Sequence, residues 1–124
     1  MDLRTVLVDD EQLARDELGY LLGQVGGVEV IGQAGNGVEA IEVLAGHGGT
    51  VDLVISDVVM PEMDGPTLLK ELRKTKPDLK IIFVSGYAEE AFEKSLPAGQ
   101  QFSFLPKPFT LKQLVAAVKE TMEG

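Results

Sequence analysis

The sequence predicts one α/β domain, in which a parallel sheet of five strands is covered by helices on both faces. Five short apolar runs alternate along the chain with segments whose apolar residues recur at helical spacing. The chain has 124 residues, which is one domain's worth and enough for a hydrophobic core. Strict alternation of strands and helices is typical of parallel sheets, whose strands are joined by helical crossovers.

The first half of the chain alternates strand, helix, strand, helix and strand. Leu18 and Leu22 belong to the apolar stripe of the first helix, which Gly26-Gly27 stops. Asn36 is a capping residue with Glu39 three positions on, which indicates the start of the second helix. These elements are expected at residues 3–8, 11–25, 28–34, from 36 to the glycine-rich stretch 46–49, and 52–56, the last of which delivers Asp57.

The second half continues the alternation. Its helices are expected from Asp64-Gly65-Pro66 to Pro77, at residues 88–95 and from Thr110 onward, and its strands at 80–84 and 102–105. The last helix has the clearest start. Thr110 and Gln113 form a capping box, and Phe109 and Leu114 occupy the positions of a hydrophobic staple.

Composition excludes several classes of function. The net charge is −9, from 20 acidic and 11 basic residues, so nucleic acid is not the expected partner. No stretch approaches the roughly 20 apolar residues that a membrane span needs. The chain has no Cys, which is compatible with a reducing cytosol and excludes thiolate metal sites.

Unusual polar residues collect where the expected strands end. Asp9 and Asp10 follow the first strand, Asp57 the third, Ser85 the fourth and Lys107 the fifth. Ligands of such sheets bind beyond the carboxyl ends of the strands. Each residue alone has a simpler interpretation: Asp10 as a helix N-cap, Ser85 as a turn residue, Lys107 as a surface cation. The combination is harder to explain in that way.

The chemistry of these residues favours a metal and a phosphoryl group. Three carboxylates in one crevice repel each other, and Lys107 alone provides too little positive charge. Oxygen ligands select a hard cation such as Mg²⁺, which commonly binds one or two carboxylates together with a phosphate oxygen. A carboxylate can accept a phosphoryl group covalently, and Asp57 is the central acid.

With these residues in place, the chain resembles the receiver domains of two-component response regulators over essentially its whole length. The resemblance rests on the acid pair at 9–10, "DVVMPEMDG" at 57–65, Ser85, and "KPF" at 107–109. It implies a single receiver domain over residues 1–124 with a flavodoxin-like, doubly wound (βα)5 fold and strand order 2-1-3-4-5.

The resemblance also implies roles for individual residues. Asp57 would accept a phosphoryl group from a phosphohistidine on a histidine kinase or histidine phosphotransfer protein. Mg²⁺ would be held by Asp57, by Asp10 directly, by Asp9 directly or through water, and by the backbone carbonyl of Val59. Lys107 and Ser85 would contact the phosphoryl oxygens.

Further expectations concern switching and partners. Ser85 and Phe104 are candidate switch residues, although Phe104 fits core packing equally well, and the Lys107–Pro108 bond would be cis. The fourth helix is expected to be mobile. Together with the fifth strand and the last helix it would form the face for partner binding or dimerisation. The domain would be cytoplasmic and would catalyse only its own phosphorylation and dephosphorylation.

Alternatives remain open at this point. A degenerate receiver could act as a scaffold. A haloacid-dehalogenase-type phosphatase would need its nucleophile on the first strand, and a flavin binder would need a phosphate loop where the acids lie. The first half of the chain resembles receivers of LytTR-type regulators and the second half those of hybrid histidine kinases, which suggests a chimera. One natural relative that matches across both halves would argue against a chimera.

Overall fold

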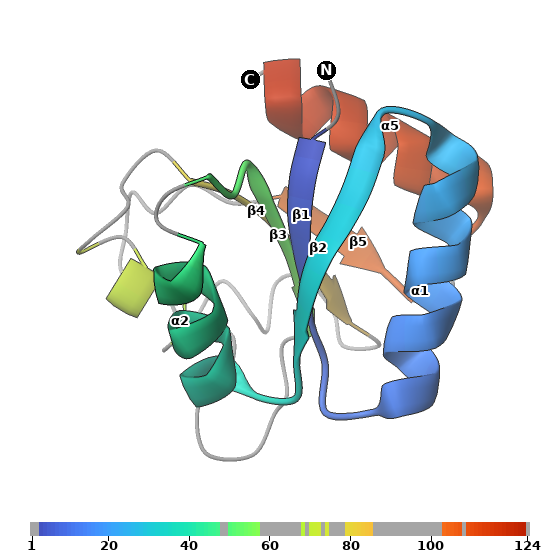
Figure 1. Ribbon diagram of the computed structural model, residues 1–124. Helices are drawn as coiled ribbons and strands as arrows, with labels where there is room; N and C mark the ends of the chain where they lie inside the picture. Colours follow the sequence, from blue (N-terminus) through green and yellow to red (C-terminus); the bar gives the residue numbers. More distant parts are fainter. Residues whose placement is uncertain are drawn as a thin grey trace.

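The computed structural model contains a five-stranded, all-parallel sheet with helices on both faces (Figure 1). The sheet order is β2-β1-β3-β4-β5, as expected. The structure describes residues 3–47, 50–57, 68, 70–72, 74, 79–85, 103–107 and 109–123. In chain order the elements are β1 Leu3–Val8, α1 Gln12–Val25, β2 Val28–Ala34, α2 Gly37–Gly46, β3 Leu53–Asp57, β4 Lys80–Ser85, β5 Ser103–Pro106 and α5 Leu111–Glu123.

Two core clusters lie on opposite faces of the sheet. On one face, Ala40 and Leu44 of α2 pack with the helical residues Leu68 and Leu72. On the other face, helices α1 and α5 meet the sheet, and Leu22 and Leu114 are fully buried there (Figure 1). Because alternate residues of a strand point to opposite faces, a nearly continuous apolar strand such as β3 supplies both clusters.

The helix starts follow the sequence signals. Asn36 caps α2: its side-chain oxygen accepts the Glu39 N–H at 2.8 Å. At α5, the Thr110 hydroxyl accepts the Gln113 N–H at 3.2 Å and Gln113 Oε1 accepts the Thr110 N–H at 2.8 Å, which confirms the predicted capping box.

Several boundaries differ from the sequence prediction, among them the end of β4, which includes Ser85. Strand β3 begins at Leu53, one residue later than expected, and the carboxylate of the preceding Asp52 accepts the Arg4 N–H at 2.9 Å. The strand ends at Asp57, also one residue later than expected. Strand β5 ends at Pro106, one residue later than expected. The N-cap of α1 is Glu11, so the alternative of Asp10 as N-cap is wrong.

Several expectations fall outside the described residues. They are the carbonyl of Val59, the Lys107–Pro108 bond, the helix at 88–95 and its mobility, and the side chain of Ser85. In the described part of the chain, no helix is both long and apolar enough to cross a membrane.

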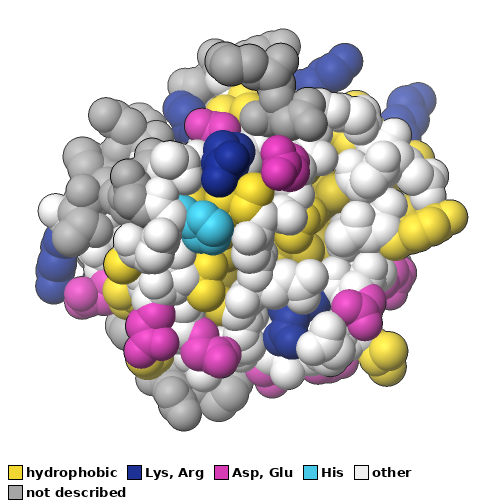
Figure 2. Space-filling view, in the orientation of Figure 1, with side chains coloured by type: hydrophobic (Ala, Val, Ile, Leu, Met, Phe, Trp, Pro, Cys, Tyr) yellow, Lys and Arg dark blue, Asp and Glu magenta, His cyan; other side chains and the backbone are white. Residues whose placement is uncertain are grey.

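Charged side chains are spread over the face that β2, α1 and α2 present. Acidic groups lie at several places around this face, and hydrophobic side chains are visible between the polar ones (Figure 2). This distribution agrees with the excess of acidic residues in the sequence.

Candidate functional site at the carboxyl ends of the strands

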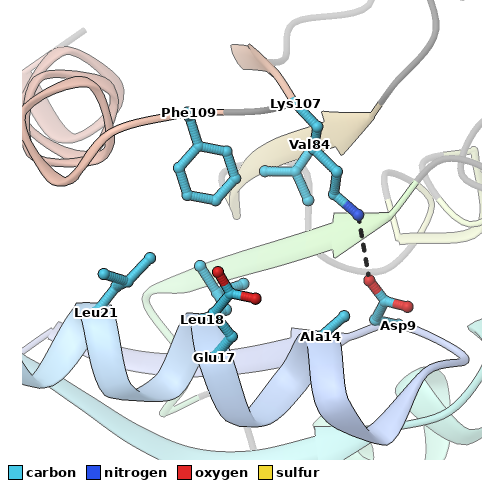
Figure 3. A pocket seen from close by; sticks show the side chains of 8 residues that line it. All are labelled: Asp9, Ala14, Glu17, Leu18, Leu21, Val84, Lys107 and Phe109. Atoms are coloured by element: carbon cyan, nitrogen blue, oxygen red, sulfur yellow. Dashed lines mark ion pairs between the residues drawn. The ribbon is translucent and has the colours of Figure 1, made fainter.

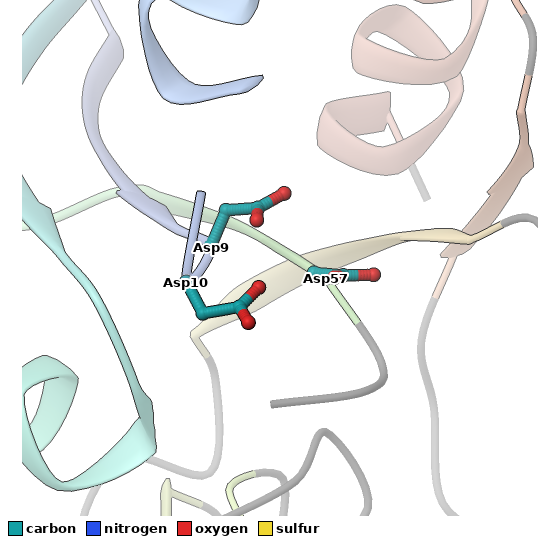
Figure 4. Close-up of side chains that lie close together, drawn as sticks. All are labelled: Asp9, Asp10 and Asp57. Carbon is teal, nitrogen blue, oxygen red and sulfur yellow. The ribbon is translucent and has the colours of Figure 1, made fainter. Parts of the chain in front are cut away.

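Three acidic side chains meet where β1 and β3 end. Asp9 and Asp10 directly follow β1, and Asp57 closes the neighbouring strand β3. Each offers one carboxylate oxygen, and these oxygens all lie within 4.8 Å of one another. The three carboxylates point to the same side of the strand ends (Figure 4). The predicted meeting of the acids is confirmed.

Asp9 is the most enclosed of the three, with 7% of its surface exposed. Its Oδ1 accepts the backbone N–H of Glu11 at 2.9 Å, and its own N–H donates to the carbonyl of Ala34 at 3.0 Å. Its Oδ2 lies 3.6 Å from Nζ of Lys107, whose side chain is 37% exposed. Asp9 is therefore held in one orientation, and Lys107 compensates part of the negative charge of the cluster.

The donor set fits a small hard cation. Mg²⁺ binds oxygen at about 2.1 Å in an octahedron, so two ligand oxygens are separated by about 3 Å when adjacent and about 4.2 Å when opposite. The 4.8 Å bound is slightly wider. A modest side-chain rotation, or one ligand acting through water, would bring the three carboxylates into this geometry.

A pocket of about 450 Å³ adjoins this cluster. Lys107 and Phe109, which follow β5, lie across from helix α1, and the Asp9–Lys107 ion pair stands at one end (Figure 3). The remaining wall is mostly apolar. It is formed by Ala14, Glu17, Leu18, Leu21 and Val84.

The other predicted residues lie on neighbouring strands. Ser85 is the last residue of β4, where it pairs in register with Pro106, and the preceding Val84 pairs with Asp57. Phe104 in β5 pairs in register with Phe83 and is partly buried against the core cluster. The structure thus contains Phe104 in a packed arrangement, as the core interpretation expected.

The sequence did not identify Arg15, Gln33 or Glu17 as part of the site. Glu17 lines the pocket, and Arg15 bonds the Asp9 carbonyl oxygen. Arg15 and Gln12 are three residues apart on α1, a helical spacing that can be seen in the sequence. The contact of Arg15 with Gln33 links α1 to β2 and requires the fold.

The five-stranded parallel sheet and the acid cluster at its carboxyl edge are typical of receiver domains. Comparison with known proteins identifies the same class. The model of the response regulator receiver domain matches residues 5–119. The chain therefore belongs to the family of response regulator receiver domains of two-component signalling. These are signalling domains and not members of a classical enzyme family. Neither the phosphatase nor the flavin-binding alternative finds support.

Individual relatives agree. The chain is 57% identical over 118 residues to the sensor kinase CckA of Brucella abortus, with 95% of this chain covered. It is 33% identical over 120 residues to the chemotaxis protein CheY of Bacillus subtilis, which it covers to 97%. The receiver domain of NarL from Mycobacterium tuberculosis superposes with a TM-score of 0.84 at 28% identity, covering 99% of this chain and 98% of that one.

The lengths of the relatives differ widely. The chain spans 12% of the sensor kinase and 44% of the sensory transduction protein LytR of Staphylococcus haemolyticus, to which it is 36% identical over 121 residues. The match to the sensor kinase runs through both halves of the chain. It therefore gives no support to a chimera.

Proposed function

We propose that residues 1–124 form one receiver domain in which Asp57 accepts a phosphoryl group from a phosphohistidine. A carboxylate oxygen of Asp57 attacks phosphorus, a P–O bond forms, the P–N bond breaks, and the imidazole leaves with its electron pair and takes up a proton. The observation that carries this proposal is the meeting of three carboxylate oxygens within 4.8 Å beside the ion pair of Asp9 with Lys107.

The surrounding residues would share the remaining tasks. Asp10 and Asp57 would hold Mg²⁺ directly, Asp9 directly or through water, and the backbone carbonyl of Val59 would complete the protein ligands. Bound Mg²⁺ would offset the charge of the acids and of the transferred group. Lys107, now on Asp9, would move to a phosphoryl oxygen, and Ser85 would donate a hydrogen bond to another.

The donor must cover the strand ends to reach Asp57. The pocket between α1 and Phe109 opens beside the acids, so a histidine kinase or phosphotransfer protein would contact its apolar wall. Leu13, which is 80% exposed on α1, adds apolar surface for that contact. The domain would then act in the cytoplasm, without direct binding to nucleic acid or membrane.

The output would pass through a different face. The fourth helix, β5 and α5 would bind the next partner or a second copy of the domain, with Ser85 and Phe104 reporting the phosphorylation of Asp57. The domain would catalyse its own phosphorylation and slow hydrolysis, with no separate substrate.

The test is phosphorylation by a small donor. The protein is incubated with Mg²⁺ and acetyl phosphate, and the intact mass is compared for the parent, Asp57→Asn and the control Asp52→Asn. Asp52 lies just before the same strand, at its opposite end, and its side chain bonds Arg4. The parent and the control gain one phosphoryl group and Asp57→Asn does not. Equal modification of Asp57→Asn would remove Asp57 from its role.

A further inference from the structure

Arg15 joins three separate parts of the chain beside the acid cluster. Its Nη1 donates a hydrogen bond to the backbone carbonyl oxygen of Asp9. Its Nε donates to Oε1 of Gln33 at 3.1 Å, and its Nη2 donates to Oε1 of Gln12 at 2.6 Å. The planar guanidinium thus bridges the turn after β1, the end of β2 and the first turn of α1, with a fork geometry that Lys cannot reproduce.

The bonded carbonyl belongs to the peptide that links Asp9 to Asp10. Rotation of this peptide plane would swing the backbone of Asp10 and carry its carboxylate away from Asp57. The hydrogen bonds of the Asp9 N–H and carboxylate fix Asp9 itself, and the bond from Arg15 fixes the peptide that follows. Gln33 and Gln12, in turn, orient the guanidinium.

We propose that Arg15 is a positioning residue, which holds the Asp9–Asp10 peptide so that Asp10 points into the metal site. The inference rests on the proposed function of the acid cluster. It assigns Arg15 no contact with metal or phosphate. Outer contacts of this kind commonly change metal affinity by about 10- to 100-fold when they are removed.

The charge of Arg15 and its hydrogen bond to the Asp9 carbonyl predict opposite changes in Mg²⁺ affinity when Arg15 is replaced. Arg15 is a cation near a cation site, so by Coulomb's law alone its removal would strengthen Mg²⁺ binding. Loss of its hydrogen bond to the Asp9 carbonyl would instead weaken Mg²⁺ binding, because Asp10 would then occupy several orientations. A role limited to joining α1 to β2 would lower the melting temperature and leave the Mg²⁺ affinity of the folded protein unchanged.

The experiment is a Mg²⁺ titration followed by amide NMR shifts, with the melting temperature measured in parallel. The variants are Arg15→Gln, Arg15→Lys and Gln33→Ala, and Lys119→Gln is the control, an exposed cation near the end of α5. We expect the Kd for Mg²⁺ to rise about tenfold in both Arg15 variants. We expect a smaller rise in Gln33→Ala and no rise in Lys119→Gln.

Each outcome decides the inference. An Arg15→Gln protein with a parent-like spectrum and an unchanged or lower Kd overturns it. If Arg15→Gln does not fold, the Arg15→Lys protein provides the test. A Kd for Mg²⁺ equal to that of the parent in Arg15→Lys would show that a positive charge is sufficient, and would overturn the inference about Arg15. Asp10→Asn separates the two proposals. If the parent and Asp10→Asn bind Mg²⁺ equally, the proposed metal site itself fails, and the inference about Arg15 fails with it.

Discussion

Asp57→Asn should stabilise the protein when Mg²⁺ is absent, because it removes one charge from a crowded cluster. The variant keeps the size of the side chain and removes its repulsion with Asp9 and Asp10. Taken at 4.8 Å, the upper limit of the distances between these carboxylate oxygens, each pair of charges repels by about 0.9 kcal/mol according to Coulomb's law with the dielectric constant of water. The repulsion of Asp57 with Asp9 and with Asp10 would together amount to about 2 kcal/mol. The positive charge of Lys107 beside Asp9 and the screening by salt reduce this repulsion to about 1 kcal/mol. For a domain of this size that is roughly 3–6 °C in melting temperature.

The assay is thermal or urea unfolding of both proteins, first in EDTA and then in Mg²⁺. In EDTA and low salt, Asp57→Asn is more stable than the parent, and the difference shrinks in about 1 M salt, where the Debye length is about 3 Å. Mg²⁺ then stabilises the parent more than the variant, because a ligand that binds only the folded state raises its stability. Equal stability in EDTA, together with equal stabilisation by Mg²⁺, would refute the account of a strained acid cluster.

Three further predictions concern the fold, and urea unfolding measures each of them. Leu114→Ala, at a fully buried position, should lower the free energy of unfolding by about 2–5 kcal/mol; a loss near zero would contradict its place in the core. Gly32→Ala should cost about 1–3 kcal/mol, because its Cβ would lie 2.8 Å from Cγ1 of Val43. In a protein that already carries Val43→Ala, Gly32→Ala should leave the free energy of unfolding nearly unchanged. A loss of about 1–3 kcal/mol in that protein as well would contradict the clash with Val43. Asn36→Ala should cost about 1 kcal/mol and Asn36→Asp much less, since Asp also caps α2; equal losses would argue against the cap.

Much of the fold could be predicted from sequence because its signals are local. The Thr110–Gln113 capping box and the Asn36 cap both formed as predicted, since each depends on residues three positions apart. The boundaries of β3 and β5 shifted by a residue. They depend on pairing between strands, such as the bond of Asp52 to Arg4, which lies far away in the sequence.

The acidic residues of the candidate site could be predicted from the sequence. The side chains that contact and orient them could not. Parallel strands bring their carboxyl ends to one edge of the sheet, so the sequence alone predicts that Asp9, Asp10 and Asp57 lie together, as the structure shows. The ion pair of Lys107 with Asp9, and the reach of Arg15 to Gln33, depend on side-chain orientations across the sheet. Local sequence patterns do not encode these orientations.

The most direct test of the central claim is to locate the acyl phosphate in the protein. After treatment with acetyl phosphate and Mg²⁺, borohydride reduces an aspartyl phosphate to homoserine, and peptide mass spectrometry then identifies the reduced residue. The account predicts homoserine at position 57 in the parent and none in Asp57→Asn. Homoserine at position 9 or 10, or at no acidic residue while the protein still gains a phosphoryl group, would contradict it.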